Sequence, residues 1–198
     1  GAPETENDGT DSDCDGSEEA LSLENAQYTF YGEMLRDAAG TLVASAGDID
    51  QDGIGDLLIA SADSDAAGST SGASYFIPGE EISVNSSLYL SQASHRYVGE
   101  AAGDGTGLSL AGVGDVDGDG LGDFLIGSGG HDGAGSNSGR AYLIRGGDTS
   151  SISLSDASSR FDGEEEGDMA GRSVAGAGDL NGDGLSDFLV GAPRAAVE

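Results

Sequence analysis

The segment AGVGDVDGDGLGDFLIG, residues 111–127, places four aspartates within nine residues and then continues into an apolar run. These aspartates, at loop positions 1, 3, 5 and 9, are Asp115, Asp117, Asp119 and Asp123, and position 6 is a glycine. Alternate carboxylates converge when a chain wraps around an ion, and glycine permits the sharp turn that wrapping requires. The segment therefore predicts a cation-binding loop that leads into a buried strand.

Two near copies of this segment occur in the chain, SAGDIDQDGIGDLLIAS at 45–61 and AGAGDLNGDGLSDFLVGAP at 175–193. The three acidic cores begin at Asp48, Asp115 and Asp179, so they are spaced by 67 and then 64 residues. Copies at such a spacing indicate stacked or radial repeats of one supersecondary unit.

Two further landmarks keep the same register. The first is an aromatic residue followed two residues later by Gly-Glu, in YTFYGE at 28–33, HRYVGE at 95–100 and SRFDGE at 159–164. The second is found in two units, as SGASYFIPG at 71–79 and SGRAYLIRG at 138–146. Because several landmarks recur together, the repeat extends over most of each unit and is not confined to the acidic loop.

The pattern within a unit predicts an all-β fold. Strands are expected at 139–145, 151–155, 171–179 and 187–191, separated by Gly, Ser and Asp turns, and no segment has sustained helical periodicity. Within 187–191, DFLVG, the aspartate is followed by a continuous apolar run, which is typical of a strand buried on both faces. Four short antiparallel strands repeated at this period predict β-propeller-type blades with hairpin loops that bind the cation.

The donor set favours calcium. All-oxygen ligands exclude a zinc or copper preference, and six to eight oxygens from a flexible loop suit Ca²⁺ better than Mg²⁺. Position 7 would contribute a backbone carbonyl. The predicted ligands of the three sites are Asp48, Asp50, Asp52, Ile54 and Asp56 in loop 48–56; Asp115, Asp117, Asp119, Leu121 and Asp123 in loop 115–123; and Asp179, Asn181, Asp183, Leu185 and Asp187 in loop 179–187.

Other acidic loops fit less well. An EF-hand needs a carboxylate at position 12, where this chain has Ile59, Ile126 and Val190, and it needs flanking helices. Thrombospondin-type loops place cysteine soon after the same opening and pack against one another. The remaining alternative is an acidic β-turn without a metal, which three copies with the ligand pattern intact disfavour.

On these residues the chain resembles the FG-GAP repeat family, best known from the propeller head of integrin α-subunits. The resemblance covers about 25–198 and rests on the aromatic-Gly-Glu landmark, the acidic loop and FLVGAP at 188–193. It implies propeller blades with Ca²⁺ in hairpin loops on one face, and extracellular adhesion or scaffolding without catalysis. Integrin-like propellers have about seven blades, so three repeats form an incomplete ring. Either the chain is a piece of a longer protein, or several copies complete each other's sheets. We expect a homo-oligomer or surface filament, or another protein or glycan as partner.

The first residues differ from the repeats, so we divide the chain into an acidic segment, 1–24, and three repeats, 25–198. Within GAPETENDGTDSDCDGSEEA, the run DGTDSDCDG resembles a Cys-containing metal-binding motif of bacterial surface proteins. A fourth, weaker cation site is a candidate there, and the alternative is a solvated acidic linker. Its ligands would be Asp11, Asp13, Asp15 and Glu19.

Composition narrows the function. The chain has 37 acidic and 7 basic residues and a formal charge of −30, which argues against a nucleic-acid or anionic-membrane partner. No apolar run is long enough to span a membrane.

Asn85 begins a glycosylation sequon, which fits an extracellular location. The two histidines have no nucleophile at useful spacing, so we expect no enzyme. The alternative function is a carbohydrate-binding or accessory module of a larger secreted enzyme.

Overall fold

The computed structural model describes residues 26–84, 86–146, 150, 152–157 and 159–196. Its elements are β1 (Thr29–Tyr31), β2 (Ala39–Gly47), β3 (Asp56–Ser61), β4 (Ala73–Ile77), α1 (Gly79–Val84), β5 (Ser87–Tyr89), β6 (His95–Val98), β7 (Ser109–Gly114), β8 (Asp123–Ser128), β9 (Arg140–Ile144), β10 (Ile152–Ser153), β11 (Ser159–Asp162), β12 (Ser173–Gly178) and β13 (Asp187–Gly191). Short 3₁₀ helices span Leu90–Gln92 and Leu154–Asp156.

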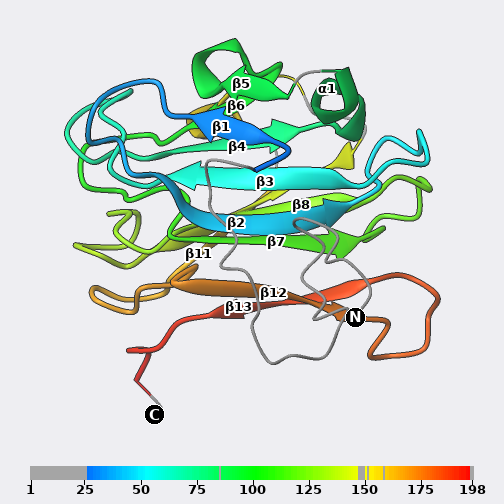
Figure 1. Cartoon of the computed structure of the whole chain (residues 1–198). Coiled ribbons are helices and arrows are strands. Elements are labelled where there is room, and N and C mark those ends of the chain that lie inside the picture. Colours follow the sequence, from blue (N-terminus) through cyan, green and yellow to red (C-terminus); the bar gives the residue numbers. More distant parts are fainter. Residues whose placement is uncertain (1–25, 85, 147–149, 151, 158, 197–198) are drawn as a thin grey trace, which may run out of the picture.

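The strands form blades, as the repeat predicted. One complete blade has the antiparallel order β2-β3-β4-β6, and the next has the order β7-β8-β9-β11. A third blade contributes β12 and β13. The sheets do not close into a barrel within the described residues, and they lie in a stack in Figure 1. This all-β, antiparallel arrangement confirms the predicted fold class of an incomplete propeller-type assembly.

One strand assignment was wrong. Among residues 152–155, Ile152 and Ser153 form a short strand, β10, but it does not belong to their own blade. Ile152 and Ser153 instead pair in parallel with Tyr97 and Val98 of β6 in the preceding blade, and a 3₁₀ helix follows directly. The fourth strand of the blade is β11, which carries the aromatic of the aromatic-Gly-Glu landmark. β5 pairs with β1 in the same parallel manner, so this connection between blades repeats.

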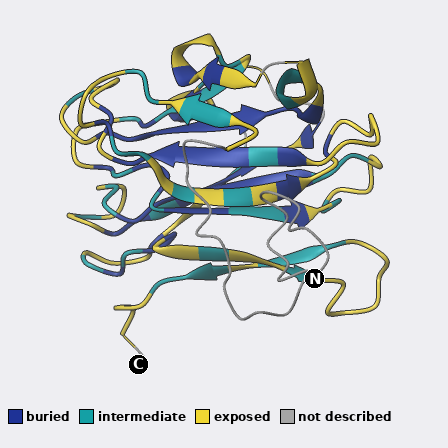
Figure 2. Ribbon diagram, in the orientation of Figure 1, coloured by how far each residue is buried: buried dark blue, intermediate teal, exposed yellow. Residues whose placement is uncertain are grey.

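The core lies between the blades. Its largest cluster joins the facing surfaces of the two complete blades, where Phe76 stacks on Phe124 at 5.6 Å between ring centroids and Tyr97 meets Phe124 edge-on at 5.5 Å. A second cluster lies where β1 and β5 cover the first blade, and a third between β8 and β13. The middle strands β3, β4 and β8 are almost continuously buried, as Figure 2 shows.

The first strands of the three blades, β2, β7 and β12, pack side by side. Each runs through an acidic loop into the second strand of its blade, so the three loops lie along the same side of the stack, at the right in Figure 1. Because the blades repeat with one geometry, the fold places three equivalent loops next to one another. None of the helices in the described part of the chain has the length and apolarity that crossing a membrane requires.

Candidate metal centre

The three acidic hairpins share one backbone design. In each, the ladder between first and second strand has a register shift at the glycine that precedes loop position 1. These glycines have positive φ angles, between 65° and 86°, which is the left-handed region that glycine enters without a steric penalty. They are Gly47, Gly114 and Gly178. The bulge turns the chain out of the sheet, so the aspartate that follows begins the loop.

The aspartate at position 1 organises the loop by accepting backbone N–H groups. In the second loop, 115–123, Asp115 accepts from Gly118 at 2.7 Å and from Gly120 at 3.0 Å. Asp179 of the third loop makes the equivalent bonds with Gly182 at 2.7 Å and Gly184 at 2.9 Å. The bonds from Gly184 and Gly182 lower the pKa of Asp179, so this carboxylate is held in its charged form.

Positions 3 and 5 continue this ladder. Asp117 accepts the N–H of Asp119 through Oδ1 at 3.2 Å, and Asp119 accepts the N–H of Leu121 through Oδ1 at 2.8 Å. In the first loop, 48–56, Asp50 and Asp52 make the same two bonds, at 3.1 and 2.7 Å. A carboxylate has two oxygens, so engaging one in the loop leaves a second that can face an ion.

Three of the four carboxylates in each of the first two loops come together. Ligand oxygens of positions 1, 3 and 9 lie within 4.8 Å of one another, and these residues are Asp48, Asp50 and Asp56 in the first loop and Asp115, Asp117 and Asp123 in the second. The position 5 aspartates, Asp52 and Asp119, stand outside these sets. In the third loop position 3 is Asn181, whose amide donates to Asp183 at 3.1 Å. The assignment of all fifteen ligands stays a prediction.

In the first two loops, the aspartate at position 9 begins the second strand and is buried. Asp123 accepts the N–H of Val116 at 2.8 Å and that of Gly146 at 3.0 Å. Asp56 accepts from Ile49 at 2.7 Å and from Gly79 at 2.7 Å. Each of these two carboxylates therefore ties its own loop to the end of the blade's third strand.

The sequence reading missed this second role, although the glycines involved end the SGASYFIPG and SGRAYLIRG landmarks. Burial raises the pKa of Asp56, and repulsion from Asp50 and Asp52 adds to the rise. The pKa of Asp123 is raised by burial and by Asp117 and Asp119 in the same way. A buried carboxylate repelled by its neighbours is an environment that a bound cation relieves, so the residues present fit an oxygen-ligated metal ion.

The loops also contact one another and one basic side chain. Ser186 of the third loop donates its N–H to the carbonyl of Asp115 at 2.8 Å, and the Gln51 amide donates to the carbonyl of Gly120. The Arg145 Nε lies 3.3 Å from Asp117 Oδ2. The three candidate sites therefore form a continuous row and are not isolated from one another.

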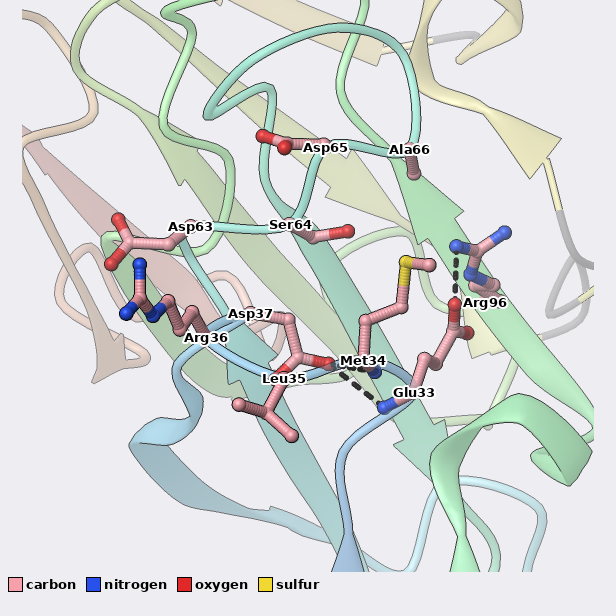
Figure 3. Close-up of a pocket in the computed structure, with 10 residues that line it drawn as sticks. All are labelled: Glu33, Met34, Leu35, Arg36, Asp37, Asp63, Ser64, Asp65, Ala66 and Arg96. Atoms are coloured by element: carbon pink, nitrogen blue, oxygen red, sulfur yellow. Dashed lines mark hydrogen bonds and ion pairs between the residues drawn. The ribbon is translucent and has the colours of Figure 1, made fainter.

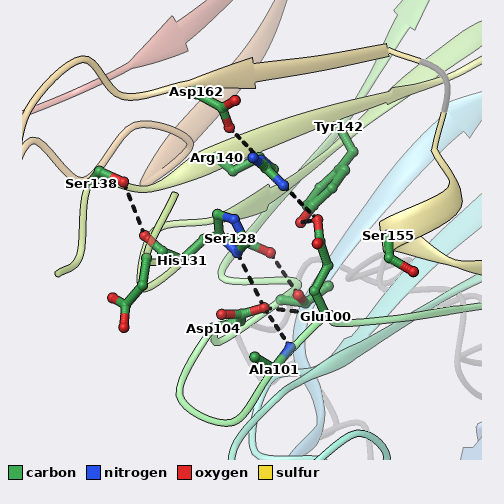
Figure 4. Close-up of polar contacts among 12 residues, drawn as sticks. Glu100, Ala101, Asp104, Ser128, His131, Ser138, Arg140, Tyr142, Ser155 and Asp162 are labelled. Atoms are coloured by element: carbon green, nitrogen blue, oxygen red, sulfur yellow. Dashed lines mark hydrogen bonds and ion pairs between the residues drawn. The ribbon is translucent and has the colours of Figure 1, made fainter. Parts of the chain in front are cut away.

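A separate polar cluster gives a role to the glutamate of the aromatic-Gly-Glu landmark (Figure 4). Glu100 follows β6 of the first complete blade, and its Oε1 accepts from Tyr142 at 2.7 Å and from Arg140 at 2.7 Å, both on β9 of the next blade. Burial alone would raise the pKa of Glu100, but these hydrogen bonds hold it below its usual range. Arg140 also pairs with Asp162, which lowers the pKa of that carboxyl.

The turn after this glutamate has its own aspartate, four residues on. Asp104 accepts the N–H groups of Glu100 and Ala101 at 3.1 and 2.9 Å, and Asp37 and Asp168 repeat the arrangement in the other units. Around Asp37 this turn borders a pocket that also includes Arg96, which pairs with Glu33 at 2.8 Å (Figure 3). The sequence interval Glu-x₃-Asp, present in all three units, could have revealed this feature.

Two predicted sites fall outside the described residues. They are the fourth candidate loop, with Asp11, Asp13, Asp15 and Glu19, and the sequon residue Asn85. Both stay predictions.

Comparison with known proteins identifies the repeat. The family model described as FG-GAP repeat matches residues 106–144 and 170–197. The first match spans β7, the second loop, β8 and β9, and the second spans β12, the third loop and β13. No curated protein matches the chain. The matched family is a structural propeller family and not a catalytic one. In these two segments, the chain carries FG-GAP repeats.

Proposed function

We propose that this chain is an extracellular calcium-binding repeat module with a structural and adhesive role, in which each acidic hairpin holds one Ca²⁺. The observation that carries the proposal is the repetition of one loop geometry in three blades, with carboxylates that converge within 4.8 Å in two of them. An ion in each loop would neutralise the carboxylate cluster and fix the hairpin that starts the second strand of the blade.

Calcium-dependent stability tests this proposal. At free Ca²⁺ about 100 times the dissociation constant, each occupied site would add roughly 2.7 kcal/mol to the free energy of unfolding. Thermal melting should therefore shift upward with Ca²⁺ and return on adding EGTA. The double variant Asp117→Asn/Asp119→Asn should lower the calorimetric stoichiometry by one ion. Identical melting curves in Ca²⁺ and in EGTA would contradict the proposal.

Exposed apolar side chains at the two ends of the stack favour a second copy of this chain as the partner. The β7 strand packs between β2 and β12, whereas the outward sides of β2 and β13 expose the apolar side chains Val43 and Leu189, 66% and 58% accessible. We propose that these two surfaces meet in a second copy, through the contact that already joins the blades. Sedimentation velocity should show a concentration-dependent oligomer that Val43→Glu weakens. A compact monomer at all concentrations would exclude it, and glycan-array binding by that monomer would favour the carbohydrate alternative.

A further inference from the structure

The first and second loops carry the same four aspartates at the same positions, so their carboxylate ligands are alike and their neighbours can set them apart. In both loops the carboxylates of positions 1, 3 and 9 converge. In both, the position 9 aspartate accepts an N–H from the glycine that ends the third strand's landmark, Gly79 in the first blade and Gly146 in the second. This shared bond fixes the residue before the glycine at the mouth of the loop.

That residue differs between the two blades. In the first it is Pro78, and in the second it is Arg145. The Arg145 Nε lies 3.3 Å from Asp117 Oδ2, with the arginine side chain 49% accessible and the aspartate side chain 26% accessible. Asp117 already holds the N–H of Asp119 through its other oxygen. Both oxygens of Asp117 are therefore engaged, and its Oδ2 can reach an ion only by sharing or losing Arg145.

We propose that Arg145 is an affinity-determining residue of the second loop. Its guanidinium acts as an internal counter-cation that competes with Ca²⁺ for Asp117, so the second loop fills at a higher calcium concentration than the first. The inference rests on the proposed function, because it concerns calcium at that same loop. A single positive charge a few ångströms from a divalent ion, in a solvent-exposed setting, should weaken binding about three- to tenfold.

To test this inference, calcium binding to the second loop must be measured without contributions from the other two loops. A background carrying Asp50→Asn, Asp52→Asn, Asp179→Asn and Asp183→Asn weakens the first and third loops. Each of the four side chains is exposed. Asparagine keeps an oxygen for the one backbone N–H that Asp50, Asp52 and Asp183 each accept, whereas Asp179→Asn also replaces one of the two oxygens that accept N–H groups of its own loop. Far-UV circular dichroism in EGTA checks that this background folds. If the background does not fold, the same titrations are made on the chain with all loops intact. The second loop should then be the weakest class of site.

Calcium titration calorimetry then compares four versions of the chain: unchanged, Arg145→Gln, Arg145→Lys and Arg160→Gln. Arg160 is the matched control, since it is exposed and donates to the carbonyl of Ser155. Arg145→Gln should tighten calcium binding about three- to tenfold, because the competing charge is lost. Arg145→Lys should keep the weak affinity, and Arg160→Gln should leave it unchanged.

The outcomes separate the inference from the proposed function. Measurable calcium binding with equal affinity in the unchanged and Arg145→Gln chains would overturn the role of Arg145 and leave the proposed function standing. Equal tightening by Arg160→Gln would also overturn it, because it would reflect net charge alone. Absence of calcium binding to the second loop in all four versions would overturn the site itself and the inference with it.

Discussion

At the scale of single residues, Glu100 couples two blades through one carboxylate oxygen. It follows the outer strand of one blade, and its Oε1 accepts from Tyr142 and Arg140 on the third strand of the next. Glu33 in the preceding unit also pairs with the blade that follows it, but its partner Arg96 lies on the fourth strand, β6. In the first two units, the glutamate of the landmark therefore joins neighbouring blades.

Removing this charge should make stability depend less on pH. The pKa of Glu100 lies below its ordinary value of 4.5 in the folded chain. Its ionised form therefore stabilises the fold above that value, and the contribution disappears as pH falls through the folded pKa. Glu100→Gln should reduce the free energy of unfolding by about 1–3 kcal/mol at neutral pH, with the difference from the unchanged chain shrinking below about pH 4.

Urea denaturation in EGTA across this pH range measures the effect. Glu165→Gln is the control, because Glu165 is exposed in the equivalent turn of the third unit and should change little. A deficit in Glu100→Gln that is the same at every pH would mean that packing, and not the carboxylate charge, explains it.

At the scale of elements, the acidic hairpins could be predicted because their determinants are local in sequence. The bulge glycine, the alternating carboxylates and the apolar strand lie within one short segment, and β12 and β13 fall inside or on the expected ranges 171–179 and 187–191. What could not be predicted depends on partners far away along the chain. The hydrogen bond from Gly146 to Asp123 joins residues 23 positions apart in the sequence. The donor lies in one landmark and the acceptor in another, so the sequence does not show that they meet.

The connection between blades is the clearest feature that the local sequence could not predict. SISLS alternates like a strand, but its pairing partner is β6 of the preceding blade, and the parallel direction has no local signal. Its leucine, Leu154, leaves the strand for a 3₁₀ helix and is fully buried in the cluster between the two complete blades. A polar-looking connector therefore contributes to the largest core of the molecule.

This burial predicts a large effect at an inconspicuous position. Leu154→Ala removes a fully buried side chain and should lower the free energy of unfolding by about 2–5 kcal/mol, through lost apolar burial and the cavity left behind. Equilibrium urea unfolding in EGTA measures it. The neighbouring exposed residue supplies the control, Ser155→Ala, which should stay within about 0.5 kcal/mol of the unchanged chain. Equal effects of the two substitutions would show that the connector does not pack between the blades.

At the scale of the whole molecule, burial is uneven along the stack. The strand β8 is buried at every residue, whereas β12 and β13 are exposed or half-buried throughout, as Figure 2 shows. The formal charge of −30 opposes compaction everywhere, so the least buried blade has the smallest apolar contribution to offset it. Local opening should therefore begin at β12 and β13.

Hydrogen exchange read by mass spectrometry tests this order. In EGTA, peptides covering β12 and β13 should exchange faster than those covering β8, because few buried contacts hold them closed. If the third loop binds Ca²⁺ as proposed, adding the ion should slow exchange most in β13, whose first residue, Asp187, accepts the loop N–H of Leu180 at 2.7 Å. Asp179→Asn/Asp183→Asn should remove this calcium effect while leaving β8 protected. Equal exchange of β8 and β13 in EGTA would contradict the gradient, since it would mean that all blades open as one cooperative unit.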